Sequence, residues 1–179
     1  DAAPLAAVLL DLDGTLADTA GDLARAMDAL RGELGLPPLA TGALRPYVSQ
    51  GARGMLAQGL DLRPDDARYV ELRDRFLDIY AGCCAVEAQL FDGFSGVLAT
   101  LRGCGLRVGI VTNKMERYAA PLLSALGVAP DADCLITPDL LAKPTPDPEG
   151  VLLACARLGA EAAQCVFVGD DRRDIEAGR

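Results

Sequence analysis

Short apolar runs recur along the chain, and longer segments with apolar residues at helical spacing separate them. Runs of this length predict strands, and the four candidates are Ala6–Leu10, Leu106–Val111, Cys134–Ile136 and Cys165–Val168. The helical patterns between them cover Gly93–Gly103, Glu116–Leu126 and Pro148–Leu158, and a last helix begins near Arg172. Short, mostly apolar strands are typical of a sheet covered on both faces. The alternation therefore predicts an α/β fold with a Rossmann-like parallel sheet.

One segment departs from this alternation. Roughly 95 residues separate the first two predicted strands, whereas a crossover between parallel strands needs about a dozen. Helical patterns fill this segment, at Asp18–Leu34, Gly42–Val48, Gly51–Leu60 and Pro64–Cys83. We therefore predict an all-helical inserted subdomain over residues 17–86, which is well placed to cover an active site. Residues 1–16 and 87–179 would form the α/β core, and we expect its C-terminal end to be truncated because a doubly wound sheet usually continues further.

The composition narrows the possible functions. Apolar residues make up 51% of the chain and charged residues 24%, which is typical of a globular protein. The formal net charge of −9 argues against nucleic acid or an anionic membrane as a partner. Histidine is absent, which excludes Ser-His-Asp and Cys-His catalysis, and the six cysteines lack metal-site spacing. No segment reads as a transmembrane helix or a signal peptide, so we expect a cytoplasmic protein, either a monomer or a homodimer.

Carboxylates follow two of the predicted strands. Asp11 and Asp13 come directly after Ala6–Leu10, and residues two apart project to the same side of an extended segment. Asp170 and Asp174 follow Cys165–Val168. Since the carboxyl ends of parallel strands share one edge of the sheet, we expect the two pairs to converge. Such a cluster suits a hard cation such as Mg²⁺, and one carboxylate of a pair can act as a nucleophile while the other moves protons.

Two further segments offer groups that can hold phosphate. Thr112 and Asn113 follow the strand Leu106–Val111, where a hydroxyl and backbone donors entering a helix can bind phosphate oxygens. Lys143 lies in a loop that prolines stiffen, and its ammonium could neutralise a phosphoryl group. Each feature alone has a simpler interpretation, as an acidic turn, a helix N-cap or a solvated lysine. Their succession after several strands favours one shared site.

These segments together resemble the four motifs of the haloacid dehalogenase (HAD) superfamily in their usual order. The matching segments are Asp11-Leu-Asp-Gly-Thr15, Val111-Thr112-Asn113, Lys143-Pro144 and Gly169-Asp170 with Asp174. The resemblance implies that Asp11 is a nucleophile that forms an aspartyl-phosphate. It implies that Asp13 protonates the leaving oxygen and then activates water. The insertion would be a helical cap of the C1 type.

The same resemblance implies the ligands of the site. Mg²⁺ would bind the Asp11 side chain, the Asp13 backbone carbonyl and Asp170, with support from Asp174. Phosphoryl oxygens would be held by Thr112, the Asn113 amide and Lys143. Asp171 and Leu12 stand where many relatives have serine and phenylalanine.

Other segments indicate a branch of this superfamily. Thr112-Asn-Lys114 and Val168-Gly-Asp-Asp171 are similar to phosphoglycolate phosphatases. Ser49-Gln-Gly-Ala-Arg53-Gly-Met55 is similar to the phosphatases that act on N-acetylmuramic acid 6-phosphate in bacterial cell-wall recycling. We therefore expect a magnesium-dependent phosphatase of a small anionic phosphorylated metabolite, N-acetylmuramic acid 6-phosphate first and phosphoglycolate as the alternative. A phosphomutase and a non-catalytic binding domain stay open. Arg53 could pair with a carboxylate of the substrate.

Overall fold

The computed structural model describes residues 4–40 and 42–179, and the chain divides into two compact units. Unit 1 contains the chain up to Ala17 and again from Leu90 onward, and unit 2 contains Asp18–Gln89. In the described part of the chain, no helix combines the length and the apolar character needed to cross a bilayer.

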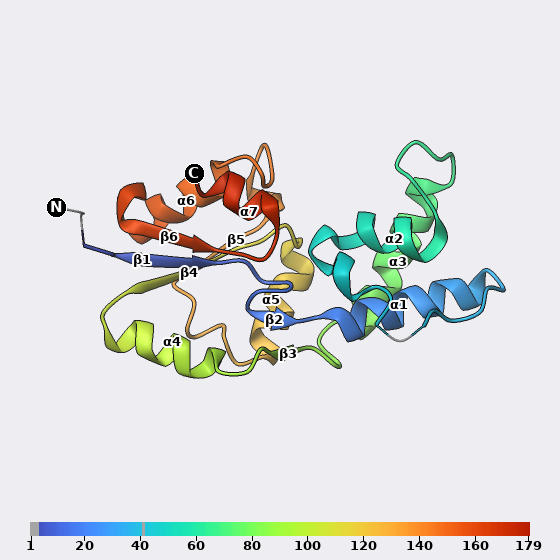
Figure 1. The fold of residues 1–179 in the computed structure, drawn as a ribbon, viewed down its shortest axis with the longest axis horizontal. Coiled ribbons are helices and arrows are strands. Elements are labelled where there is room, and N and C mark those ends of the chain that lie inside the picture. The colour runs from blue at the N-terminus through green and yellow to red at the C-terminus, as the bar shows by residue number, and fades with distance from the viewer. Residues whose placement is uncertain (1–3, 41) are drawn as a thin grey trace. The chain divides into compact units, whose positions relative to one another are not determined.

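Unit 1 is built on a sheet of four parallel strands in the order β5-β4-β1-β6. The strands are β1 (Ala7–Leu10), β4 (Arg107–Val111), β5 (Cys134–Ile136) and β6 (Cys165–Val168). Helices α4 (Phe94–Gly103) and α5 (Glu116–Ala125) lie on one face, and α6 (Glu149–Leu158) and α7 (Arg172–Ala177) lie on the other (Figure 1). Short 3₁₀ helices cover Pro138–Leu140 and Ala162–Gln164.

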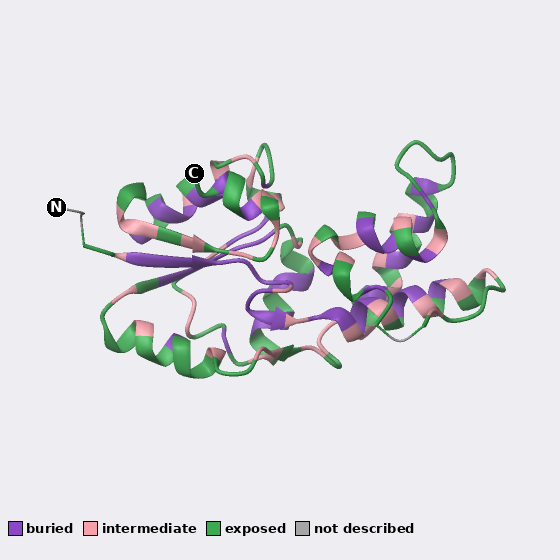
Figure 2. Cartoon of the chain, in the orientation of Figure 1, coloured by how far each residue is buried: buried purple, intermediate pink, exposed green. Residues whose placement is uncertain are grey.

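Burial follows the position of each strand in the sheet. Every residue of the central strand β1 is buried, as expected for a strand with a neighbour on each side and helices on both faces (Figure 2). The edge strand β6 alternates instead. Its Phe167 packs beside the α6 core, whereas Val166 and Val168 are 47% and 39% exposed. The core of unit 1 therefore lies around β1 and β4.

The register of the strands decides which residues leave the sheet together. Leu10 of β1 lies opposite Ile110 of β4 and Val168 of β6. Gly109 of β4 leaves room for the side chain of its partner Leu9, because a Cβ there would lie 2.7 Å from Cδ2 of Leu9. The residues after Leu10, Val111 and Val168 therefore leave the sheet at its carboxyl edge.

Unit 2 is helical. It consists of α1 (Ala20–Glu33), a 3₁₀ helix at Arg45–Gln50, α2 (Gly51–Leu60) and α3 (Tyr69–Cys83), and the three α-helices pack against one another. Its largest fully buried side chains include Met27, Met55, Phe76 and Tyr80. Asp22 of α1 is fully buried as well, and its carboxylate accepts backbone N–H groups from Ala85, Glu87 and Ala88.

The two passages of the chain between the units run beside each other. β2 (Ala17–Asp18) and β3 (Gln89–Leu90) form a two-stranded sheet. Within unit 1, the Phe91 N–H donates to the Leu16 carbonyl at 3.2 Å. The insertion therefore leaves and re-enters unit 1 at neighbouring points.

The structure confirms the predicted parallel sheet and its four strands, and it corrects two helices of the insertion. The helix predicted at Gly42–Val48 is wrong, because residues 42–44 form turns and a 3₁₀ helix follows at Arg45–Gln50. The helix predicted at Pro64–Cys83 begins only at Tyr69. Asp66 explains the late start, because its carboxylate accepts the Arg68 N–H at 2.8 Å in a local turn that competes with the helix.

Candidate active site

Three strand ends build the site. The Asp11 N–H donates to the Val168 carbonyl at 2.9 Å, so β1 and β6 stay paired until Asp11 leaves the sheet. On the other side, the Thr112 N–H donates to the Ile136 carbonyl at 3.0 Å. These bonds fix the backbone of Asp11 and Thr112 at the carboxyl edge, where Asp170 also emerges two residues after β6.

Three carboxylates meet at this edge. Asp11, Asp170 and Asp174 each offer an oxygen atom, and these oxygens lie within 4.8 Å of one another. Asp11 and Asp174 are buried, and Asp170 is exposed. The Thr15 hydroxyl donates to Oδ1 of Asp170 at 3.1 Å and orients that carboxylate. The convergence expected from the sequence is therefore present for these three residues.

Burial makes the ionised form of these clustered carboxylates unfavourable. Desolvation, followed by the charges of Asp13 and Asp174, raises the pKa of Asp11 well above its usual value. Desolvation also raises the pKa of Asp174. Carboxylate oxygens that are crowded together are the donors that a hard divalent cation prefers. The residues present therefore fit Mg²⁺.

Two glycines allow the carboxylates to approach. Gly14 has a φ of +89°, and a Cβ on it would lie 2.5 Å from Oδ2 of Asp170. A Cβ on Gly169 would collide with the carboxylate of Asp174. Larger residues at either position would push a carboxylate out of the cluster.

The start of α7 separates the roles of its acidic residues. Asp171 is the N-cap, because its carboxylate accepts the Arg173 N–H at 2.9 Å. Oδ2 of Asp174 accepts the Asp171 N–H at 3.0 Å, which holds the Asp174 side chain over the first turn. The Arg173 side chain also binds Asp171 and lowers the pKa of that carboxyl. Asp171 therefore caps the helix, and Asp174 is directed to the cluster.

Asp13 has a different partner. Nζ of Lys114 lies 2.9 Å from Oδ1 and 3.1 Å from Oδ2 of Asp13. The two side chains are only 7% and 13% exposed. Asp11 and Asp13 therefore share a strand end but have different surroundings, one among carboxylates and the other against an ammonium group.

The candidate phosphate-binding residues differ in their placement. Thr112 is buried, and its Oγ1 accepts the Lys114 N–H at 3.1 Å, next to the ion pair of Asp13. Asn113 is exposed. The Lys143 side chain is 74% exposed, and its Nζ lies 3.8 Å from Oδ2 of Asp147 in the same loop. The structure thus bonds Thr112 to the backbone of Lys114, whose side chain contacts Asp13, and gives Lys143 a partner within its own loop.

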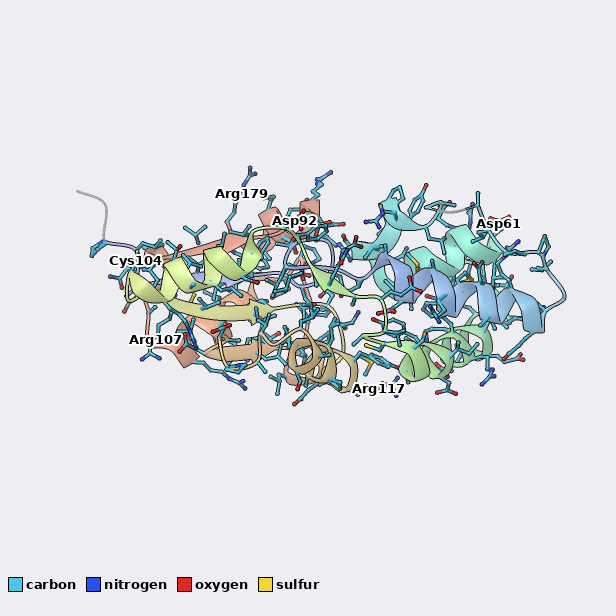
Figure 3. The ribbon with its side chains drawn as sticks, turned by 90° about the horizontal axis from the view of Figure 1, so that it is seen from below. Asp61, Asp92, Cys104, Arg107, Arg117 and Arg179 are labelled. Carbon is cyan, nitrogen blue, oxygen red and sulfur yellow. The ribbon has the colours of Figure 1, made fainter. Side chains whose placement is uncertain are left out.

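Other candidates lie outside this cluster. Arg53 belongs to unit 2, where it is exposed in the first turn of α2. All six cysteines are free thiols. Cys104 is exposed, and it lies with Arg107 at the end of the sheet where the strands begin (Figure 3).

Sequence reasoning missed two partners in the site. Thr15 was part of the first motif without a role of its own, and Lys114 was part of the segment Thr112-Asn-Lys114 without one. Lys114 did carry a signal. It lies three residues after the end of a predicted strand, and the chain has only one other lysine, Lys143.

Comparison with known proteins places the chain in a family. The family model for haloacid dehalogenase-like hydrolases matches residues 5–179. The N-acetylmuramic acid 6-phosphate phosphatase of Pseudomonas aeruginosa is 45% identical over 175 residues, which cover 98% of this chain and 77% of the relative. A phosphoglycolate phosphatase of Xanthomonas campestris pv. campestris is 44% identical over 173 residues, 97% of this chain and 78% of the relative.

Solved structures show the same fold. The crystal structure of a predicted phosphoglycolate phosphatase from Haemophilus somnus matches with a TM-score of 0.84 at 23% identity, covering 97% of this chain and 80% of that one. The sequence identity to the named phosphatases and the match of the family model over nearly the whole chain agree with the order of the motifs. The chain belongs to the haloacid dehalogenase-like hydrolase family.

Proposed function

We propose that the protein is a Mg²⁺-dependent phosphomonoesterase in which Asp11 is the nucleophile and Asp13 moves protons. The observation that carries this proposal is the unequal setting of the two carboxylates. Asp11 lies in the cluster with Asp170 and Asp174, and Asp13 is held by Lys114 outside it. Phosphatase activity agrees with the relatives, which are named as phosphatases.

The metal would be held by the side chains of Asp11, Asp170 and Asp174 and by the backbone carbonyl of Asp13. When bound, Mg²⁺ supplies positive charge that neutralises phosphoryl oxygens during the displacement. The raised pKa of Asp11 supports this assignment, because the Asp11 carboxyl needs a cation beside it to stay ionised as a nucleophile.

The residues of unit 1 then divide the reaction between them. A carboxylate oxygen of Asp11 attacks phosphorus, and the bond from phosphorus to the leaving oxygen breaks. Asp13 gives its proton to that oxygen and later takes a proton from the water that attacks the aspartyl-phosphate, which frees Asp11 and inorganic phosphate. Thr112, the Asn113 amide and Lys143 would hold the phosphoryl oxygens. In this role Lys143 turns away from Asp147 towards the substrate.

For the substrate we propose N-acetylmuramic acid 6-phosphate, with phosphoglycolate as the alternative. The relatives named above support each of the two, at nearly the same identity. Both compounds carry a carboxylate as well as a phosphate ester, and an arginine can bind a carboxylate through two hydrogen bonds. In this scheme the residues of unit 1 would contact the phosphoryl group, and unit 2, acting as a cap, would choose the substrate.

Arg53 is the cap residue that we propose for the substrate carboxylate. Arg53→Ala should lower kcat/KM for the carboxylate-bearing substrate by about 10- to 100-fold, because a charge-assisted pair is lost. Activity on p-nitrophenyl phosphate, which has no carboxylate, should stay near the wild-type value. Arg63→Ala, which removes an exposed arginine of the same unit, serves as the control. An equal effect on both substrates would contradict the assignment.

The activity itself is tested by phosphate release. Purified protein is incubated with N-acetylmuramic acid 6-phosphate and with phosphoglycolate, each with MgCl₂ and with EDTA. We expect release with Mg²⁺, none with EDTA, recovery after Mg²⁺ is restored, and none from Asp11→Asn. Full activity after exhaustive chelation would overturn the proposal. Isomerisation of a sugar phosphate without phosphate release would indicate a phosphomutase.

A further inference from the structure

Lys114 is a buried cation that the proposed chemistry leaves without a role. Its Nζ contacts both carboxylate oxygens of Asp13, at 2.9 and 3.1 Å. Both side chains are almost fully shielded from solvent. Solvent and salt screen such a pair far less than a surface ion pair. The contact therefore restricts the position of the Asp13 carboxyl group.

The backbone around Lys114 is fixed too. β4 ends at Val111, and the hydroxyl oxygen of Thr112 accepts the Lys114 N–H at 3.1 Å in a tight local turn. Asp13 follows β1, the strand that pairs directly with β4. The ammonium and the carboxylate are thus anchored on neighbouring strands.

The second lysine has none of these features. Lys143 is mostly exposed, and its nearest ion-pair partner is the carboxylate of Asp147, 3.8 Å away in its own loop. Two lysines with such different settings do not serve the same purpose. An exposed lysine can turn towards a ligand. A shielded lysine that contacts both oxygens of one carboxylate instead affects that carboxylate.

We propose that Lys114 is the positioning residue for Asp13: it holds the Asp13 carboxyl group in place for proton transfer to the leaving oxygen. This inference rests on the proposed function. As an oxygen of Asp11 bonds to phosphorus, the bond to the leaving oxygen breaks and that oxygen takes the proton of Asp13. Negative charge then develops on Asp13, and the Lys114 ammonium stabilises it at hydrogen-bond distance. Lys114 keeps its own protons throughout.

A comparison of leaving groups tests this role. An alkoxide leaves only with a proton, whereas p-nitrophenolate leaves without one. For Lys114→Met we expect the first-turnover rate on the better of the two proposed alkyl substrates to fall about 100-fold, with KM changed by less than about threefold. The first-turnover release of p-nitrophenolate from p-nitrophenyl phosphate should fall by less than about fivefold.

Two further variants keep the test decisive. Lys114→Gln retains a hydrogen-bond donor without the charge and should give the same contrast between substrates, with a smaller loss. Arg117→Gln removes an exposed cation from α5, three residues along, and should change neither rate (Figure 3). Thermal unfolding of each variant verifies that it is folded.

The outcomes are distinct. Equal losses on both substrates in folded variants would overturn the inference, because Lys114 would not act through proton transfer. A raised KM with unchanged kcat would overturn it too and would make Lys114 a ligand of the phosphoryl group. Failure of the proposed function would appear separately, as a wild-type protein that hydrolyses none of the substrates.

Discussion

At the scale of single residues, environment rather than residue type separates Asp11 from Asp13. The two lie two positions apart on one strand end. Burial and neighbouring carboxylates raise the pKa of Asp11, and Asp13 contacts an ammonium group. A buried carboxylate without an opposite charge destabilises the folded state when it ionises. Asp11, the proposed nucleophile, should therefore reduce the stability of the metal-free protein.

Asp11→Asn should accordingly stabilise the metal-free protein. The pKa of Asp11 is higher in the folded than in the unfolded state. Wild-type stability therefore falls as pH rises from the ordinary value of 3.8 towards the raised folded value. We expect the variant to melt higher in EDTA at neutral pH, by about 2–4 °C for each kcal/mol relieved, and the gain to vanish near pH 4.

The control for this measurement is Asp65→Asn, which changes an exposed carboxylate of unit 2 and should leave Tm unchanged. Added Mg²⁺ should raise Tm of the wild type more than that of Asp11→Asn, because the variant has lost a ligand. A variant that melts below the wild type at every pH in EDTA would contradict the electrostatic account.

At the scale of elements, one buried side chain ties helix α1 to the segment that leads out of unit 2. Asp22 accepts three backbone N–H groups from residues 85–88, at 2.8 to 3.2 Å. The same carboxylate lies in the first turn of α1, where a negative charge is favourable. It therefore replaces the backbone pairing that this irregular segment lacks.

Asp22→Ala should lower the free energy of unfolding by about 3 kcal/mol, because three backbone donors lose their buried acceptor at once. Asp22→Asn keeps one carbonyl oxygen and should lose less. Denaturant unfolding followed by circular dichroism measures both, and Asp28→Asn on the same helix is the comparison variant. Among the described residues, the N–H that Asp28 accepts comes from Leu39. If Asp22→Ala is as stable as the wild type, the hydrogen bonds of Asp22 to residues 85–88 do not stabilise unit 2.

Elements and residues differ in how far the sequence predicted them. Short apolar runs identified all four strands, because the central strand is buried throughout and even the exposed positions of the edge strand, Val166 and Val168, are apolar. The insertion was harder to predict. Its turn at Asp66 depends on a hydrogen bond between a side chain and the backbone, and the spacing of apolar residues does not predict such a bond. Strand-end carboxylates pointed to Asp11, Asp170 and Asp174, but the contact between Asp13 and Lys114 joins residues 101 positions apart and needed the three-dimensional structure.

At the scale of the whole molecule, the proposed chemistry and the proposed choice of substrate belong to different units. All the clustered carboxylates, the Asp13–Lys114 pair and Thr112 belong to unit 1, and Arg53 belongs to unit 2. If unit 2 chooses the substrate, catalysis and substrate preference can be separated by removing unit 2.

Removal of residues 18–89, with Ala17 joined to Leu90 through a short glycine linker, should leave Mg²⁺-dependent hydrolysis of p-nitrophenyl phosphate. The preference for the carboxylate-bearing substrate over p-nitrophenyl phosphate should fall about 100-fold, because remote binding energy is lost. Steady-state kinetics and circular dichroism of the shortened chain measure both. A folded variant that keeps the full preference would place substrate choice in unit 1.

The bond between the Phe91 N–H and the Leu16 carbonyl has a consequence for how such proteins can change over evolution. The ends of the inserted segment are already neighbours, so for unit 1 the whole insertion amounts to one closed loop. The entropy of closing a loop grows only with the logarithm of its length, and a longer, shorter or unrelated insertion would change that term by little. The inserted segment can therefore be replaced during evolution without change to the strand ends that carry the carboxylates. A new insertion would then bring a new substrate preference.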